Sequence, residues 1–156
     1  MSVMLAGLAA ACSPQKAAQE EKAFAEVAEV HPESGLTVIP VVVSTGEATH
    51  EFRAELANTP DLQAKGLMFR TKLGPDEAML FPNEKPTARS FWMKNTPIPL
   101  DIIFVGLDGR ITNIAAMAEP YSVDPVYSIG STSAVLEIAG GRAEELGIEA
   151  GDRVTW

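Results

Sequence analysis

Residues 90–105 carry the side chains best suited to binding a ligand. The stretch opens with an aromatic and thioether cluster that includes Trp92, and it continues with the polar residues Lys94, Asn95 and Thr96. An indole ring offers a flat face for stacking and attracts cations, while ammonium, amide and hydroxyl groups bind polar atoms. We therefore predict a binding site at residues 92–96, although the stretch defines no reaction.

The residues that follow indicate how this site would be held. Pro97 and Pro99 fix the backbone and remove two amide donors, so the segment must be a bend or a sheet edge. Residues 102–105 form an apolar run that predicts a strand covered on both faces. The alternative is that Trp92 is a core plug, because large apolar side chains are more often buried than functional. An exposed ring beside Lys94 would favour binding, and an enclosed ring would favour the plug.

Further charged residues are candidates for the same site. Arg70, together with Arg89 and Lys94, would rim a pocket for an anionic group, unless these charges are simply solvated. Glu137 interrupts the apolar residues 135–138. It lies either on a solvated face or toward a site where Lys94 or Arg89 would pair with it.

Asp101 and Glu137 are the carboxylates that could form an acid–base pair. Both adjoin apolar runs that could raise a carboxylate pKa, and an envelope hydrolase is the corresponding alternative function. The favoured role of Asp101 is structural, as an acceptor of hydrogen bonds from the backbone of Asn95 and Thr96. We assign no catalytic residue, and a non-enzymatic role is favoured while enzymatic activity is left open.

The sequence lacks the residue clusters that hold metals or cofactors. Its two histidines, His31 and His50, are far apart, and it has no glycine-rich phosphate loop and no nucleophile elbow. Met68 and Met93 have the thioether that Cu(I) prefers, but without ligand spacing or a Cys or His partner they are better explained as core residues. We predict no metal site and no cofactor.

Several motifs resemble those of one protein family. They are the hairpin residues Asp108 and Gly109 and the segments 65–70 (KGLMFR), 79–81 (MLF), 91–104 (FWMKNTPIPLDIIF) and 135–141 (VLEIAGG). Over roughly residues 50–156 the chain resembles the DUF192 family, a bacterial and archaeal family named for its unknown function. The resemblance implies a compact, β-rich fold similar to a jelly roll or barrel, and it implies no catalytic residue.

Composition and local patterns predict one mainly β domain. With 156 residues, 46% of them hydrophobic, the chain is long enough for one core and too short for two ordinary domains. Short apolar or alternating segments between Gly and Pro residues indicate strands, as at residues 49–57, 78–81 and 88–93, with a turn at residues 82–86 and a long loop at residues 119–130. One or two short helices are expected, after Pro60 and at residues 142–146. The predicted fold is a single compact β-barrel or sandwich, jelly-roll-like, over residues 36–156.

Residues 1–12 have the layout of a bacterial lipoprotein signal. A short run of small apolar residues ends at Cys12, the single cysteine, and a polar tract follows. In such signals, cleavage leaves the cysteine as the first residue, which is then lipidated. A plain cleaved signal peptide and an uncleaved tail are the alternatives, because no Lys or Arg precedes the run. Residues 13–35, rich in Ala, Glu, Gln and Lys, are expected to be a flexible tether.

The net charge of the chain argues against one class of function. A formal net charge of −9 argues against nucleic-acid binding, which needs a basic face. We expect an exported envelope protein on the periplasmic side of a bacterial membrane, lipid-anchored through Cys12 or secreted. It would be a small ligand-binding or accessory module whose partner is an unknown small molecule or envelope component. Besides the hydrolase, a purely structural domain is the remaining alternative.

Overall fold

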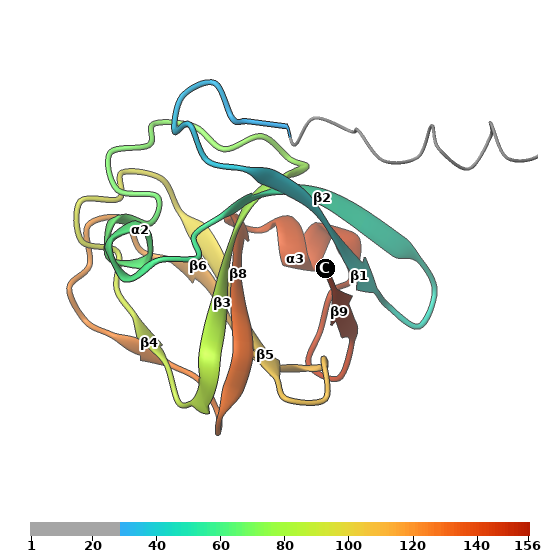
Figure 1. Ribbon diagram of the computed structural model, residues 1–156. Coiled ribbons are helices and arrows are strands. Elements are labelled where there is room, and N and C mark those ends of the chain that lie inside the picture. Colours follow the sequence, from blue (N-terminus) through green and yellow to red (C-terminus); the bar gives the residue numbers. More distant parts are fainter. Residues whose placement is uncertain (1–28) are drawn as a thin grey trace, which may run out of the picture.

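The computed structural model describes residues 29–156 and shows a mainly β fold with two short helices (Figure 1). The elements are, in chain order, β1 (Val38–Ser44), β2 (Thr49–Leu56), α2 (Pro60–Lys65), β3 (Glu77–Thr87), β4 (Ser90–Phe91), β5 (Leu100–Gly106), β6 (Ile111–Ala118), β7 (Val126–Tyr127), β8 (Thr132–Ala139), α3 (Arg142–Leu146) and β9 (Arg153–Thr155). Seven strands form one sheet in the order β6-β5-β8-β3-β2-β1-β9, and β4 and β7 form a separate ribbon. Only β2 and β3 run parallel among the paired strands of this part of the chain.

The large sheet curls but is not closed into a barrel. Its edge strands are β6 and β9. Backbone hydrogen bonds between residues 109–111 and 151–154 bring the start of β6 against β9, yet they form only an isolated bridge between Arg110 and Arg153. The predicted mainly β class with short helices is confirmed, whereas closure of the sheet into a barrel is not observed in residues 29–156.

Alternation along the strands divides the core between the two faces of the sheet. On β8, Leu136 and Ile138 belong to the first core cluster, on the first face of the sheet. Val135 belongs to the second core cluster, on the second face, so Glu137 lies on the second face as well. The first face is covered by α3 and the second by α2 and the β4–β7 ribbon. Figure 1 shows α2 and β4 to the left of β3 and β8, and α3 to the right. The segment predicted to hold the site therefore covers the face that carries Glu137.

Helix α2 forms where the sequence predicts a helix start. Thr59 is the N-cap, and its hydroxyl accepts a hydrogen bond from the amide of Leu62 at 3.3 Å. Pro60 occupies the first turn, where no amide donor is needed. Gly66 ends the helix with a φ of 48°, a value that strains side chains with a Cβ. The helix thus ends just before Leu67, which packs into the second core cluster.

The structure differs from the sequence prediction between β3 and β7. The turn predicted at residues 82–86 is part of β3, whose register to β8 shifts between Pro82 and Thr87. An irregular, largely exposed end of a strand tolerates prolines because few ladder bonds are lost there. The strand predicted at residues 88–93 shortens to β4, which pairs with β7 inside the loop predicted at residues 119–130.

Residues 29–35 lie against the domain. Val30 forms a bridge with Thr37, and Glu29 and Glu33 pair with Arg53 and Arg70. The final part of the segment expected to be a tether is thus in contact with the fold. Cys12, the predicted signal and residues 13–28 lie outside the described residues. No helix in residues 29–156 is long and apolar enough to cross a membrane.

Candidate functional site

A pocket of about 260 Å³ lies between α2 and the segment that runs from β4 to Thr96. Glu137 of β8 lies in its wall, with the aromatic residues Phe81, Phe91 and Trp92 around it. The other residues that line it are Gln63, Ala64, Lys65, Gly66, Leu67, Met68, Arg89, Ser90 and Lys94. Of the predicted site residues, the structure brings five together here, namely Arg89, Trp92, Lys94, Thr96 and Glu137.

Trp92 is exposed at the mouth of this pocket. Half of its surface, 50%, is accessible to solvent, and the Nζ atom of Lys94 lies 5.2 Å from the centroid of its ring. The buried member of the cluster is Met93, which is 3% exposed and belongs to the second core cluster. Phe91 packs edge-on against Phe81, with their ring centroids 5.1 Å apart. Met93 and not Trp92 is therefore the core plug, and the exposed ring beside Lys94 favours binding.

The backbone around Asn95 holds the two walls of the pocket together. Asn95 has a φ of 58°, and its carbonyl accepts a hydrogen bond of 2.7 Å from the amide of Phe69, which itself has a φ of 67°. The buried Thr96 accepts a bond of 3.1 Å from the amide of Tyr121. Left-handed conformations are costly for residues other than glycine and cluster at functional sites. Asn95 does not line the pocket, and its amide nitrogen lies 3.8 Å from the sulfur of Met68.

Glu137 is a buried carboxyl that faces the pocket. It is 5% exposed and lies between Met79 of β3 and Ile102 of β5 in the sheet register. Burial raises the pKa of its carboxyl from 4.5 to about 8, so it is mostly protonated at neutral pH. Within residues 29–156 its carboxyl forms neither a hydrogen bond nor an ion pair, and the interpretation as a solvated residue is wrong. The other alternative was that Glu137 points toward a site where Lys94 or Arg89 pairs with it. Glu137 does line the same pocket as Arg89 and Lys94, but it does not pair with them.

Glu137→Gln is expected to stabilise the protein increasingly as the pH rises from about 5 to about 8. Between the ordinary pKa of 4.5 and the folded value of about 8, only the unfolded state releases this proton. The free energy of unfolding of the wild type therefore falls by up to about 4 kcal/mol over this range, and the glutamine variant lacks this contribution. Urea unfolding of both proteins as a function of pH measures the difference. A difference that is constant with pH would contradict the buried titration.

Arg89 lines the pocket, and its hydrogen-bond partners are uncharged side chains. Its guanidinium donates to the side-chain oxygens of Asn83 and Gln63 and lies 5.3 Å from the centroid of the Phe91 ring. Burial lowers the pKa of Arg89. In the described part of the chain no carboxylate pairs with Arg89, Lys94 or Lys65, so their charges are uncompensated around the cavity.

Arg70 does not belong to this pocket. The prediction that it rims an anion site is wrong, because its side chain is 8% exposed and paired with the buried carboxylate of Glu55. Glu33 lies 3.5 Å from the same guanidinium and His31 3.4 Å from it. Arg70 borders a smaller, separate cavity of about 190 Å³, and its role is to neutralise Glu55.

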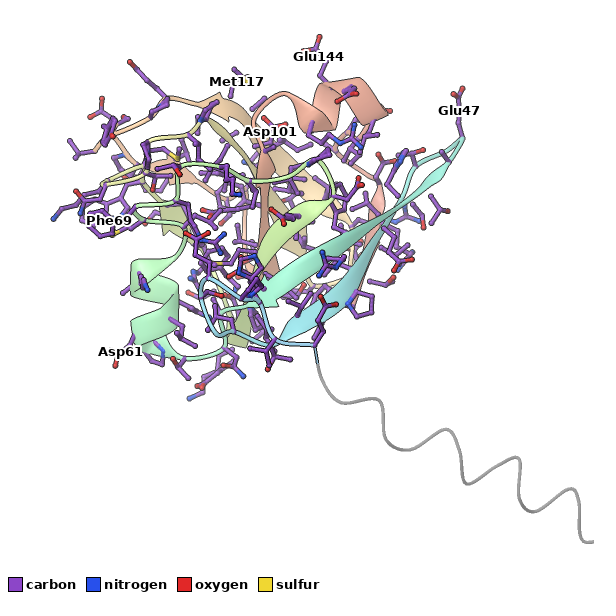
Figure 2. All side chains as sticks on the ribbon, turned by 90° about the horizontal axis from the view of Figure 1, so that it is seen from above. Glu47, Asp61, Phe69, Asp101, Met117 and Glu144 are labelled. Atoms are coloured by element: carbon purple, nitrogen blue, oxygen red, sulfur yellow. The ribbon has the colours of Figure 1, made fainter. Side chains whose placement is uncertain are left out.

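Asp101 has a structural role, but not with the partners predicted. Its carboxylate, completely buried, accepts hydrogen bonds from the amides of Met117 (2.8 Å), Gly141 (3.0 Å) and Ala143 (2.8 Å) and not from residues 95–96. Figure 2 shows Asp101 beside α3 and close to Met117. Asp101 thus ties α3 and the end of β6 to β5.

The geometry also excludes Asp101 and Glu137 as an acid–base pair. In the antiparallel register of β5 and β8, Asp101 is opposite Ile138 and Glu137 is opposite Ile102. Directly opposite residues share a face and neighbours along a strand alternate, so the two carboxyls lie on opposite faces of the sheet.

Sequence reasoning assigned no site role to the wall formed by α2 and the turn after it. Gln63, Lys65, Gly66 and Met68 line the pocket. A Cβ on Gly66 would be in ordinary contact with the Phe81 ring, 3.4 Å away, so the positive φ of 48° is what favours glycine in this turn. The available signal was the segment KGLMFR, which belongs to the motifs of the resemblance.

Comparison with known proteins agrees with those motifs. The DUF192 family, described as “Uncharacterized ACR”, matches residues 41–156. The crystal structure of a protein of unknown function from Novosphingobium aromaticivorans has a TM-score of 0.82, with 56% identity over 86% of this chain and 96% of that one. A Sinorhizobium meliloti protein, provisionally described as a transcription regulator, has a TM-score of 0.75, with 36% identity over 77% of this chain and 94% of the other. No protein among the curated ones compared matches. The chain belongs to the DUF192 family.

Proposed function

We propose that the chain is a small ligand-binding module whose site is the pocket next to Trp92. The observation that carries the proposal is Glu137, a buried carboxyl without a partner among the described residues, which faces the same cavity as the exposed indole. A buried polar group that lacks a partner destabilises a fold, so its presence in a cavity points to a ligand or a proton that uses it.

The form of the site supports binding of a compact molecule with one flat apolar face. Trp92 and Lys94 provide an exposed surface at the mouth, and Phe81 and Phe91 provide apolar walls. The volume of about 260 Å³ is slightly below the range of about 300 to 1,000 Å³ that is typical of pockets for drug-sized ligands. The hydrogen bond between Phe69 and Asn95 fixes both sides of the pocket before any ligand enters.

Trp92→Ala is expected to abolish ligand binding while it changes the melting temperature by no more than about 3 °C. The ring is half exposed and its removal creates no buried cavity, so the cost in stability should stay below about 1 kcal/mol. A thermal-shift screen of the wild type against sugars, cell-wall fragments, metals and anions identifies a compound that stabilises the folded state. The same compound should then fail to stabilise the variant.

Trp156→Ala is the matched control for this experiment. Trp156 is 49% exposed, almost the same as Trp92, and does not line the pocket. It should keep the full stabilisation by the compound. Equal stabilisation of both variants would place binding elsewhere, and a large loss of stability in Trp92→Ala without ligand would make Trp92 structural.

We also propose that the module is attached to the envelope through a lipidated Cys12. The supporting features are the short apolar run that ends at this cysteine and the polar residues that follow it. Two or more acyl chains anchor a protein stably, since each buried CH₂ contributes about 0.8 kcal/mol.

Cys12→Ser is expected to move the protein from the membrane fraction to the soluble fraction, or to leave it unprocessed. Fractionation of cells that express wild type and variant, with immunodetection, gives the distribution. Wild-type protein found only in the soluble periplasmic fraction would favour the plain signal peptide instead.

A further inference from the structure

We propose that the pocket takes a small organic anion, with the neutral carboxyl of Glu137 donating a hydrogen bond to an oxygen of the ligand and with Lys65, Arg89 and Lys94 balancing its charge. This inference rests on the proposed function, and it assigns the chemical class of the ligand. The anionic group would lie toward Glu137, and the apolar body would lie against the aromatic residues.

The charged side chains around the cavity are mainly cationic. Lys65 comes from the end of α2, Arg89 precedes β4 and Lys94 follows it, so the cations come from both sides of the pocket. Among residues 29–156, Glu137 is the only acidic residue that lines the cavity. In the described chain, Arg89 is held by the neutral side chains of Asn83 and Gln63, and none of the cations has a carboxylate partner. Cations without partners around a concave site create a positive potential that attracts anions.

Glu137 does not neutralise the cations around the pocket. An ionised carboxylate in the pocket wall would attract these cations, yet within residues 29–156 none of them pairs with it. Burial raises the pKa of Glu137 to about 8, so near neutral pH its carboxyl can donate a hydrogen bond. A donor in the wall together with cations complements an anionic oxygen, and it does not complement an ammonium group or a metal ion.

Charged groups from two other elements face Glu137. From α2 the facing group is Lys65, and from the segment around β4 the facing groups are Arg89 and Lys94. Within the sheet, Met79 separates Glu137 from Glu55, which is already paired with Arg70. Loss of the Glu137 proton would place a negative charge in the pocket wall, and this charge would repel an anion.

The experiment compares anions with neutral molecules of nearly the same shape. We would titrate benzoate against benzamide, and glucuronate against glucose, into the full chain, and follow the indole and backbone amide signals of the pocket by NMR. At about pH 6, the anion of at least one pair should bind at least tenfold more tightly than its neutral partner, with the largest shifts at Trp92. Above the Glu137 pKa of about 8, its affinity should fall by about tenfold per pH unit.

Two variants test the roles of individual groups. Glu137→Gln, whose amide donates a hydrogen bond at every pH, should remove the fall in affinity above pH 8. Glu137→Leu should weaken binding below about pH 8, where it lacks the donor, and should likewise show no fall above it. Lys94→Met should weaken binding of the anion and leave binding of the neutral partner unchanged. A steep fall above pH 8 that persists in Glu137→Gln would overturn the role of the carboxyl.

The outcomes separate this inference from the proposed function. If a neutral partner binds in the pocket as tightly as its anion, the anion class is wrong and ligand binding at Trp92 stands. If none of these probes shifts the pocket signals at millimolar concentration, the anion inference is overturned. If, in addition, no compound of the thermal-shift screen depends on Trp92, the proposed function is overturned as well.

Discussion

Asp101→Ala should lower the free energy of unfolding by about 3 to 5 kcal/mol. Its carboxylate is completely buried and accepts hydrogen bonds from three backbone amides. A buried donor left without its acceptor costs about 1 to 3 kcal/mol, and bonds to a charged acceptor are at the upper end of the range. For a domain of this size the loss corresponds to a fall of roughly 10 to 20 °C in the melting temperature.

The effect of Asp101→Ala should be concentrated at α3 and at the end of β6. Gly141, the N-cap of α3, has no side chain to cap the helix, and Asp101 of β5 supplies the acceptor instead through bonds to Gly141 and Ala143. The third bond fixes Met117, which has a φ of 49°. Hydrogen exchange should therefore show loss of protection first at these three amides.

Asp108→Ala is the matched control for Asp101. Asp108 lies at the exposed hairpin between β5 and β6, and its carboxylate accepts one bond of 3.1 Å from the amide of Arg110. Its replacement should cost less than about 1 kcal/mol. A cost for Asp101→Ala that is no larger than that of the control would mean that water or relaxation satisfies the three amides.

The elements predicted correctly are those whose signals are local. The alternation in β2 and the Thr59–Pro60 start of α2 predict structure from a few consecutive residues, because strand faces and helix caps depend on near neighbours. The pairing of β4 with β7 and the order of the large sheet depend on residues that are distant in the sequence. Periodicity carries no information about such partners.

The same distinction separates the predicted site residues that line the pocket from those that do not. Trp92 and Lys94 line it because their own segment is a short ribbon followed by a bend with two prolines. Arg70 and Asp101 are equally polar and equally close to motif residues, but each meets a buried partner from another part of the chain. Alternation correctly placed Glu137 on the face opposite to its apolar neighbours. It could not show that α2 and β4 cover that face.

Arg70→Met should lower the free energy of unfolding by about 3 to 5 kcal/mol, because it leaves the carboxylate of Glu55 buried without its cation. Glu55 is 1% exposed, and within the described residues its second oxygen already lacks a hydrogen-bond partner. Breaking a buried ion pair from one side is strongly destabilising, whereas replacing both partners by apolar residues of similar volume is often neutral. The double variant Arg70→Met with Glu55→Leu should therefore recover most of the lost stability.

The exposed pair of Arg53 and Glu29 is the control for this prediction. Both side chains are about half exposed, and Arg53 lies on β2 two residues from Glu55. Arg53→Met should change stability by less than about 1 kcal/mol, because solvent screens exposed pairs. Urea unfolding of the two single variants and the double variant gives the coupling energy between Arg70 and Glu55. If the double variant is no more stable than Arg70→Met, the loss comes from the packing of the arginine side chain, and Glu55 is not the uncompensated charge.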